Sequence, residues 1–192
     1  MSVSIGPTST DADLVAETRN GSHQAFRELV MRYEGTVAAT VIGMLGPGSE
    51  AEDAGQDVMI RFYQSLDRFE GKSSLKTYIT RIAVNQSIDV IRRRKRMRWR
   101  LWSSREDEPG IDVYADPRDR GREAENRRAV HQALRELPEE FRAVAVLRMM
   151  QGYSTQETAD LLCVPLGTVL SRLSRAKAQL AKLLKDEDHG PE

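Results

Sequence analysis

The sequence contains very little of the chemistry that disulfides, metal sites and most enzymes need. Cys163 is the only cysteine among 192 residues, so no intramolecular disulfide can form and a thiolate zinc site would lack partners. His23, His131 and His189 lie far apart and show no metal-ligand spacing. No carboxylate cluster, histidine pair or nucleophile arrangement indicates catalysis. We therefore expect a protein that is not an enzyme and that uses no metal or cofactor.

Long hydrophobic runs are also missing. The longest uncharged run, residues 35–49, is interrupted by three glycines and a proline, and it is shorter than the ~20 apolar residues that cross a bilayer. Residues 1–10 have neither the basic start nor the apolar core of a signal peptide. These features predict a cytoplasmic protein with no membrane insertion. Aromatic residues make up only 6%, so aliphatic side chains must fill its cores.

The net charge is zero, but the charges are unevenly distributed along the chain. Residues 1–90 carry 8 basic and 12 acidic side chains, whereas residues 91–102 carry 7 basic and no acidic ones. Residues 103–126 carry 4 and 8, and residues 127–192 carry 10 and 9. One dense basic segment on an otherwise neutral or acidic chain predicts a local contact with nucleic acid.

Apolar residues recur at helical spacing through most of the chain, which predicts an all-α protein. Helices are expected over residues 10–20, 22–45, 49–66 and 75–102, with a polar loop at 69–74 between the last two. Capping boxes are expected at Thr10 with Asp13 and at Ser49 with Glu52.

Residues 103–126 contain prolines and glycines and few apolar side chains, which indicates a linker. We predict two small helical domains joined by this flexible acidic linker. The expected boundaries are a disordered N-terminus over 1–10, a first domain over 11–102, the linker over 103–125, a second domain over 126–185 and a tail over 186–192.

The second domain contains the pattern of a helix-turn-helix. Ser154 and Glu157 form a capping box that opens a short helix, residues 163–165 form the turn, and a second helix follows to Leu184. One face of that helix is apolar, and the opposite face carries hydroxyl, guanidinium and amide groups that suit a major groove. A solvated face is the commoner explanation for an isolated amphipathic helix. The capped helix, short turn and acid-free second helix together favour DNA binding.

Several motifs resemble the extracytoplasmic-function (ECF, group 4) sigma factors of the sigma-70 family. The first domain carries AEDAGQDV at 51–58, LDRFEGKSSLKTYI at 66–79 and RIAVN at 81–85, and the second carries GTVLSRL at 167–173. The order of these motifs is more specific than any one of them. The resemblance assigns 11–102 to sigma region 2 and 126–185 to sigma region 4.

The resemblance implies binding to core RNA polymerase through its clamp helices and flap, recognition and melting of promoter DNA, and control by an anti-sigma factor. It implies polymerase contacts at Asp53, Gln56, Asp57 and Arg61. It implies minus-ten and melting contacts at Lys72, Ser73, Ser74, Lys76, Tyr78, Asn85, Asp89, Arg92, Arg93, Arg94 and Arg96. It implies minus-thirty-five contacts at Ser154, Thr155, Gly167, Thr168, Ser171, Arg172, Arg175 and Gln179.

Some alternatives stay open at this point. Tyr78 fits a core aromatic as well as a base-stacking residue, and the basic run also complements the helix dipole. Cys163 stands where the family usually has glycine, and Leu170 stands where it usually has a basic residue. The rival functions are a conventional repressor or activator that uses the second domain alone, and a nuclease.

Overall fold

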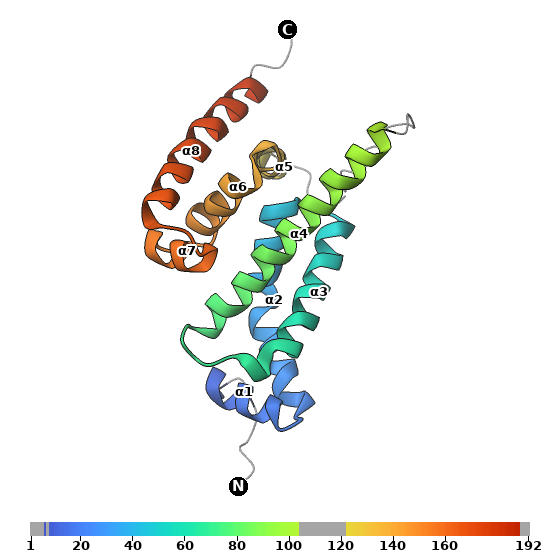
Figure 1. The fold of residues 1–192 in the computed structure, drawn as a ribbon, viewed down its shortest axis with the longest axis vertical. Helices are drawn as coiled ribbons and strands as arrows, with labels where there is room; N and C mark the ends of the chain where they lie inside the picture. The colour runs from blue at the N-terminus through green and yellow to red at the C-terminus, as the bar shows by residue number, and fades with distance from the viewer. Residues whose placement is uncertain (1–5, 7, 104–121, 189–192) are drawn as a thin grey trace.

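The computed structural model describes residue 6 and residues 8–103 and 122–188. Its helices, shown in Figure 1, form two groups that lie side by side. The first group is α1 (Asp11–Arg19), α2 (His23–Leu45), α3 (Ser49–Ser65), the short 3-10 turn η1 (Leu66–Arg68) and α4 (Leu75–Ser103). The second group is α5 (Arg122–Glu136), α6 (Glu139–Ala145), the π-helical turn η2 (Val146–Met150), α7 (Thr155–Leu162) and α8 (Leu166–Asp188). The described residues contain no strand, and the predicted all-α fold of two helical domains is confirmed. The predicted linker lies mostly outside the described residues, and α5 begins within its last part.

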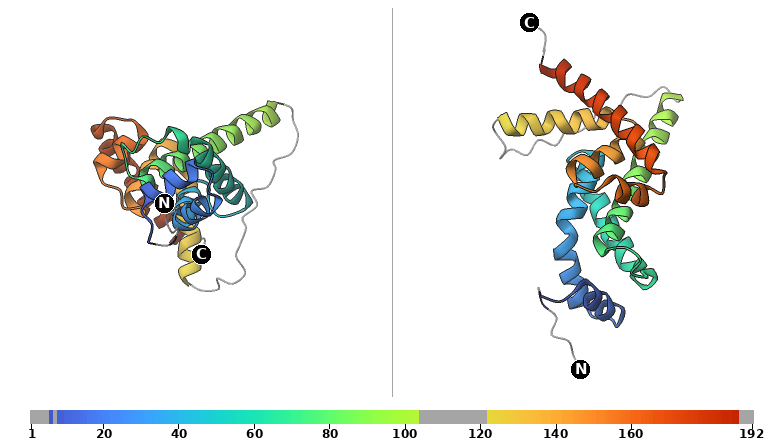
Figure 2. Two further views of the ribbon diagram at one scale, coloured as in Figure 1. Left: turned by 90° about the horizontal axis from the view of Figure 1, so that it is seen from below. Right: turned by 90° about the vertical axis from the view of Figure 1, so that its left-hand side faces the viewer.

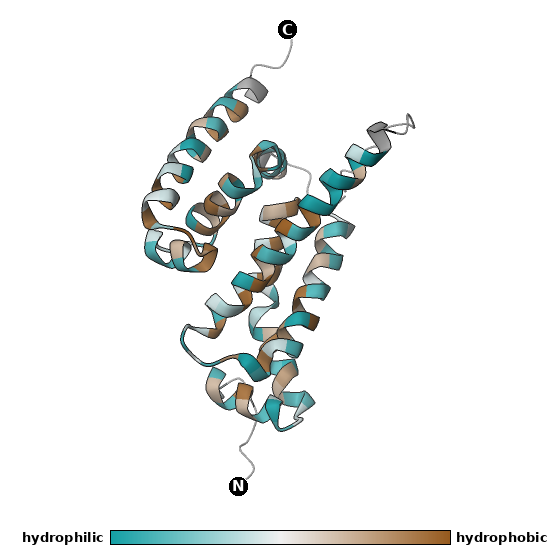
Figure 3. Cartoon of the chain, in the orientation of Figure 1, coloured by the Kyte–Doolittle hydropathy of each residue, from teal (hydrophilic) through white to brown (hydrophobic). Residues whose placement is uncertain are grey.

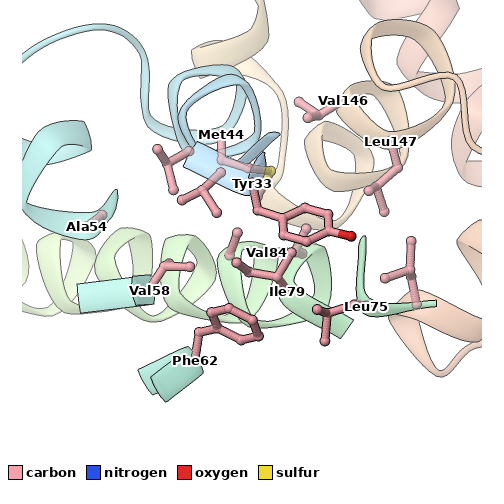
Figure 4. Packing of buried hydrophobic residues seen from close by; sticks show 14 of the residues in the cluster. Tyr33, Met44, Ala54, Val58, Phe62, Leu75, Ile79, Val84, Val146 and Leu147 are labelled. Carbon is pink, nitrogen blue, oxygen red and sulfur yellow. The ribbon is translucent and has the colours of Figure 1, made fainter. Parts of the chain in front are cut away.

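Helices α2, α3 and α4 form the first domain around an aliphatic core with few aromatic rings. Val58, Phe62 and Ile79 are fully buried between them, as Figure 4 shows. Helix α1 closes one end of this bundle, where the Arg19 guanidinium donates to the carbonyl oxygen of Leu66 at 2.7 Å. Brown and teal residues alternate along α3 in Figure 3, and its buried residues Ala51, Ala54, Val58 and Phe62 recur at helical spacing.

Two of the three predicted capping boxes are present. The Thr10 hydroxyl accepts from the Asp13 N–H, and the Ser154 hydroxyl accepts from the Glu157 N–H. The prediction for Ser49 was wrong: the N-cap of α3 is Gly48, with no side-chain cap, and Ser49 already lies inside the first turn. Gly46 and Gly48 both have positive φ, of 86° and 136°, so the chain turns into the helix one residue before the serine.

The two domains share one buried surface. Val146 and Leu147 of η2 are fully buried against the core of the first domain, next to Met44 and Tyr33 in Figure 4. A Cβ atom on Gly43 of α2 would lie 3.0 Å from the Val146 methyl groups, so glycine permits this close approach. The views in Figure 2 agree that α5 crosses the end of α2. The domains therefore pack against each other through side chains far apart in the sequence.

Arg142 of α6 lies at the centre of this shared surface. It is only 3% exposed, and it donates to the carbonyl oxygens of Met44 at 2.6 Å, Leu137 at 3.0 Å and Arg135. Burial lowers the pKa of its guanidinium to about 10, so it stays protonated at neutral pH. One buried cation thus joins the end of α2 to the junction between α5 and α6.

Replacing this guanidinium is expected to destabilise the fold. Arg142→Met keeps the apolar stem but leaves three carbonyl oxygens without their donor, so we expect the free energy of unfolding to fall by about 2–4 kcal/mol. Urea unfolding followed by circular dichroism measures this change. The control Arg128→Met, at an exposed position of α5, is expected to change stability by less than about 0.5 kcal/mol. Equal stabilities of the two variants would contradict the role of Arg142.

Candidate nucleic-acid interface

The candidate melting loop leads into α4 through a serine cap. The Ser74 hydroxyl accepts from the Thr77 N–H at 3.1 Å and shares a 2.8 Å hydrogen bond with the Thr77 hydroxyl. The Ser74 side chain is therefore engaged in starting the helix. Gly71 has a φ of 71°, and Lys72 beside it forms an ion pair with Glu70 while remaining 85% exposed. The loop presents Gly71 and Lys72 to solvent, and Ser73 is half-buried.

Tyr78 packs within the first domain. Its ring lies 5.0 Å from the Phe69 ring, and its hydroxyl donates to the Ser65 carbonyl oxygen at 3.2 Å. The side chain is half-buried. Tyr78 therefore supports the base of the loop by packing on Phe69, and its packing matches the core-aromatic interpretation of the sequence.

One face of α4 carries a row of polar and basic side chains. Arg81, Asn85, Arg92 and Arg96 follow one another at intervals of four, seven and four residues, which places them on one side of a helix. Asn85, Arg92 and Arg96 are exposed, as is Arg93 beside this row. Figure 3 shows the far half of α4 as mostly hydrophilic. We call this row, together with Lys95 and Trp99, the α4 face.

Trp99 is the residue of this face that sequence reasoning missed. It follows Arg96 by three residues and Arg92 by seven, and its side chain is 78% exposed. The signal that could have found it is the helical spacing of the basic run, which places Trp99 on the same side of the helix as Arg92 and Arg96. A large exposed aromatic among cations suits contact with nucleic acid.

Several cations of α4 are held by the second domain. The Glu139 carboxylate of α6 pairs with Arg92 at 3.2 Å and with Lys95. The Arg81 guanidinium donates to the Asp160 carbonyl oxygen at 2.9 Å, and Lys76 lies 5.5 Å from the centre of the Tyr153 ring. Arg94 instead pairs with Glu50 of α3 at 3.4 Å. The α4 face is thus directed partly toward solvent and partly toward the second domain.

The Glu139 carboxylate is well suited to hold these cations. Its pKa lies below its ordinary value, because Lys95 and then Arg92 donate hydrogen bonds to it, and these outweigh the opposing effect of burial. A depressed folded-state pKa means that the contact is fully present at neutral pH and is lost as the pH falls through that low pKa. The ion pairs are therefore complete under ordinary conditions.

The candidate polymerase contacts lie together on α3. Asp53, Gln56, Asp57 and Arg61 are all exposed. Two of them also contact α4: Asp57 accepts from the Gln86 amide at 2.8 Å, and Arg61 lies 3.8 Å from the Asp89 carboxylate. The structure therefore places these residues beside the candidate minus-ten residues. We call Asp53, Gln56, Asp57 and Arg61 the α3 face.

A cavity of about 600 Å³ lies between α2, α3 and α5. Aliphatic side chains such as Val41 and Met59 line it, with Gln56 of the α3 face and His131 of α5 at its walls. Burial lowers the pKa of His131, so this imidazole favours its neutral form. Because Gln56 lines it, the cavity borders the α3 face.

The helix-turn-helix forms as predicted, from α7, a three-residue turn and α8. Val144, Ala159 and Val169 pack together in its small core. The candidate DNA-contacting residues of α8 lie on one side of the helix, opposite the buried Ala176 and Leu180. Gly167, Ser171, Arg175 and Gln179 are exposed, and Thr168 and Arg172 are half-buried. Ser154 is exposed but its hydroxyl caps α7, and Thr155 is half-buried.

The described residues include no group of three or more histidine, cysteine, aspartate or glutamate side chains placed to hold a metal ion. Within the same residues, no helix combines the length and apolar character that crossing a membrane requires.

Comparisons with known proteins match both halves of the chain. The family profile of Sigma-70 region 2 matches residues 29–97, and that of Sigma-70 region 4 matches residues 127–180. The ECF RNA polymerase sigma factor SigW of Bacillus subtilis is 30% identical over 90% of this chain and 95% of its own length. The ECF RNA polymerase sigma-E factor of Escherichia coli is 33% identical over 88% and 91%.

Solved structures share this arrangement of helices. The sigma factor RpoE of Bartonella quintana, in complex with the anti-sigma factor NepR, is 25% identical and has a TM-score of 0.66 over 83% of this chain and 96% of its own. CnrH, in complex with the cytosolic domain of CnrY, has the same TM-score at 24% identity, over 92% and 97%. This second likeness shows the fold alone.

The turn of the helix-turn-helix supplies a test at Cys163. This residue has a φ of 52° and lies in the left-handed region, where a side chain costs about 1–2 kcal/mol. Because glycine loses more backbone entropy on folding, we expect Cys163→Gly to raise the free energy of unfolding by no more than about 1 kcal/mol. Cys163→Val is expected to lower it by about 1–2 kcal/mol, because a branched side chain fits this conformation poorly. Urea unfolding of both variants checks the order, and a valine variant as stable as the glycine variant would contradict it.

Proposed function

The chain belongs to the ECF RNA polymerase sigma factors, and we propose that it binds core RNA polymerase, directs it to specific promoters and promotes DNA melting for transcription initiation. We also propose that it belongs to group 4 of these sigma factors and that it acts in the cytoplasm. One observation supports this proposal above all: a single chain carries the α4 face, the acid-free polar face of α8 and the α3 face. Each is a surface that one step of initiation requires.

Polymerase docking is assigned to the exposed α3 residues. Asp53 and Gln56 are exposed and offer a carboxylate acceptor and an amide. Polar side chains on a rigid helix suit the clamp helices, which form a coiled coil. Because Asp57 and Arg61 contact Gln86 and Asp89 of α4, docking on α3 is coupled to the position of the α4 face.

Melting is assigned to the loop before α4 and to the α4 face. Unstacking a base costs a few kcal/mol, and contact with protein must return about that amount. Gly71, Lys72 and Ser73 give a small, polar surface that a flipped base can approach. Asn85 and the cations from Arg92 to Arg96 can hold the adjacent bases and phosphates, with Tyr78 supporting the loop from within.

Minus-thirty-five recognition is assigned to α8. Arginine can pair with guanine and glutamine with adenine, while serine and threonine bind phosphate. Arg172, Arg175 and Gln179 take the base-reading roles, and Thr168 and Ser171 take the phosphate-binding roles. Since both DNA-reading domains belong to one chain, binding of the first raises the effective concentration of the second to about millimolar.

Control by an anti-sigma factor is also part of the proposal. The similar structure of the Bartonella quintana sigma factor contains an anti-sigma factor as its partner. A protein that covers the α3 and α4 faces would block both docking and DNA binding. Purification of the chain from its own cells in different growth conditions tests this: recovery of polymerase alone in every condition would count against such a partner.

Run-off transcription with purified core polymerase tests the function. Linear DNA carrying a promoter found by transcription-start mapping after overproduction of the protein is the template. We expect transcripts of defined length only when the chain is added to core enzyme. A conventional repressor or activator would give none, and cleavage of the template by the protein alone would instead revive the nuclease hypothesis.

Trp99 supplies a test of the α4 face. Stacking of an aromatic side chain on a base contributes about 1–3 kcal/mol, so we expect Trp99→Ala to weaken promoter binding by the polymerase complex about tenfold. Trp99→Phe keeps an aromatic ring and is expected to retain most of the affinity. Fluorescence anisotropy of labelled promoter DNA measures both. An alanine variant that binds like the unchanged chain would remove Trp99 from the interface.

A further inference from the structure

The cavity between α2, α3 and α5, which we call the α2–α3–α5 cavity, has the size and composition of a small-molecule site. Its volume is about 600 Å³, and pockets that bind small ligands are mostly apolar and occupy about 300–1,000 Å³. Val37, Val41 and Ala51 are buried side chains of its wall, and Ile42 and Met59 pack beside them. None of the described residues that line it is phenylalanine, tyrosine or tryptophan. The wall therefore favours an aliphatic molecule over one that needs aromatic stacking.

A glycine inside α3 keeps part of this space open. Gly55 lines the cavity and lies in the interior of α3, where glycine is less favourable than alanine because it loses more backbone entropy on folding. Close packing does not require it, because a Cβ atom at this position would meet Val41 Cγ2 at an ordinary contact distance of 3.9 Å. At Gly43, by contrast, a Cβ atom would lie 3.0 Å from the Val146 methyl groups. The cavity therefore explains the glycine at position 55, whereas packing explains the one at position 43.

One polar atom of a residue in the cavity wall lacks a hydrogen-bond partner. His131 of α5 lines the cavity, and its Nδ1 atom is buried with no partner among the described residues. Buried polar atoms normally have one. Because burial lowers the pKa of this imidazole, the ring favours its neutral form, in which one nitrogen donates and the other accepts. A ligand hydroxyl group, which both donates and accepts, would satisfy Nδ1 in either tautomer.

The charged side chains that line the cavity balance one another. Glu34 of α2 and Glu52 of α3 are exposed, as are Arg127 and Arg128 of α5. Two carboxylates and two guanidinium groups leave no net charge that would favour an ionic ligand. An ionised group that moves from water into apolar surroundings without a counter-charge is strongly disfavoured. The cavity therefore favours an uncharged ligand.

We propose that the α2–α3–α5 cavity binds an uncharged, mainly aliphatic alcohol whose hydroxyl group hydrogen-bonds to Nδ1 of His131. The aliphatic part packs on Val37, Val41 and Met59, in the space that Gly55 leaves open. This inference goes beyond promoter recognition, since none of the residues described as lining the cavity belongs to α4 or α8. Because α2, α3 and α5 all supply its wall, a bound molecule stabilises the folded chain.

Two glycine variants form a matched pair for the test. Gly55→Leu places a branched aliphatic side chain in the cavity. Gly35→Leu makes the same change at an exposed position inside α2 that is not among the residues lining the cavity. Both replace a helix-interior glycine by a good helix former, and circular dichroism checks that each variant folds. His131→Leu tests the hydrogen bond separately, and it keeps the site testable if Gly55→Leu does not fold.

The probe is 1-decanol, and sodium decanoate, which has the same chain length but a charged head group, is the comparison ligand. Isothermal titration calorimetry with the full chain measures both affinities, and the NMR signals of the Val37, Val41 and Met59 methyl groups locate the bound molecule. We expect saturable binding of 1-decanol with shifts of these methyl signals. Decanoate is expected to bind at least about tenfold more weakly, because its carboxylate would have to leave water.

The variants are expected to differ in their affinity for 1-decanol. Gly55→Leu should weaken binding at least about tenfold relative to Gly35→Leu, because its side chain occupies the space of the ligand. Gly35→Leu should bind 1-decanol like the unchanged chain. His131→Leu should weaken binding about fivefold, which is the size of one lost hydrogen bond. The midpoint of thermal unfolding should rise with 1-decanol for the unchanged chain and for Gly35→Leu, but not for Gly55→Leu.

Each outcome supports or overturns one part of the site. Equal affinities of Gly55→Leu and Gly35→Leu, or no saturable binding to the unchanged chain, would overturn the cavity as a ligand site and would leave it filled by water or by a partner's side chain. Tighter binding of decanoate than of 1-decanol would overturn the uncharged ligand. Unchanged 1-decanol affinity of His131→Leu would overturn the hydroxyl contact.

Discussion

The buried guanidinium of Arg142 is the contact on which the relation between the two domains depends. It is the donor for carbonyl oxygens at the end of α2 and at the junction of α5 and α6. Met44 and Arg135 lie in the last turns of α2 and α5, where carbonyl oxygens have no partner within their own helix, and Leu137 follows the end of α5. A buried charge is stable there only because several acceptors surround it. The cation therefore satisfies helix ends from both domains at once, and it fixes where α6 lies on the first domain.

The position of α6 then determines what the α4 face can contact. Glu139 begins α6, so the anchoring of Arg142 one turn later brings the Glu139 carboxylate to Arg92 and Lys95. Favourable charge pairing between the domains adds specificity to their packed interface. The acidic residue that faces the α4 cations belongs to a domain whose α8 carries only basic charges between Asp160 and Asp186. The charges of the second domain are thus divided between two surfaces, one complementary to α4 and the other complementary to DNA.

Local structure was readable from the sequence, whereas contact between the domains was not. Capping at Thr10 and Ser154 and the strained turn at Cys163 follow from residue types over three or four positions. Ser49 failed because Gly46 and Gly48 changed the backbone before the helix, which a residue pattern does not reveal. Val146 and Gly43 are about a hundred positions apart in the sequence, and Glu139 and Lys95 are 44 positions apart, so no periodicity connects either pair. The sequence therefore predicted which residues form the candidate surfaces, but it did not predict that the second domain packs against α4.

The packing of the second domain against the first has an energetic consequence. Separating the two domains would expose the apolar surface of Val146 and Leu147 and would leave Arg142 without the Met44 acceptor, so separation costs free energy. The α3 face, which we propose for polymerase docking, adjoins α4 through Asp57 and Arg61. Because the same side-chain contacts join α3 to α4, a partner bound on the α3 face and nucleic acid bound on the α4 face would influence each other.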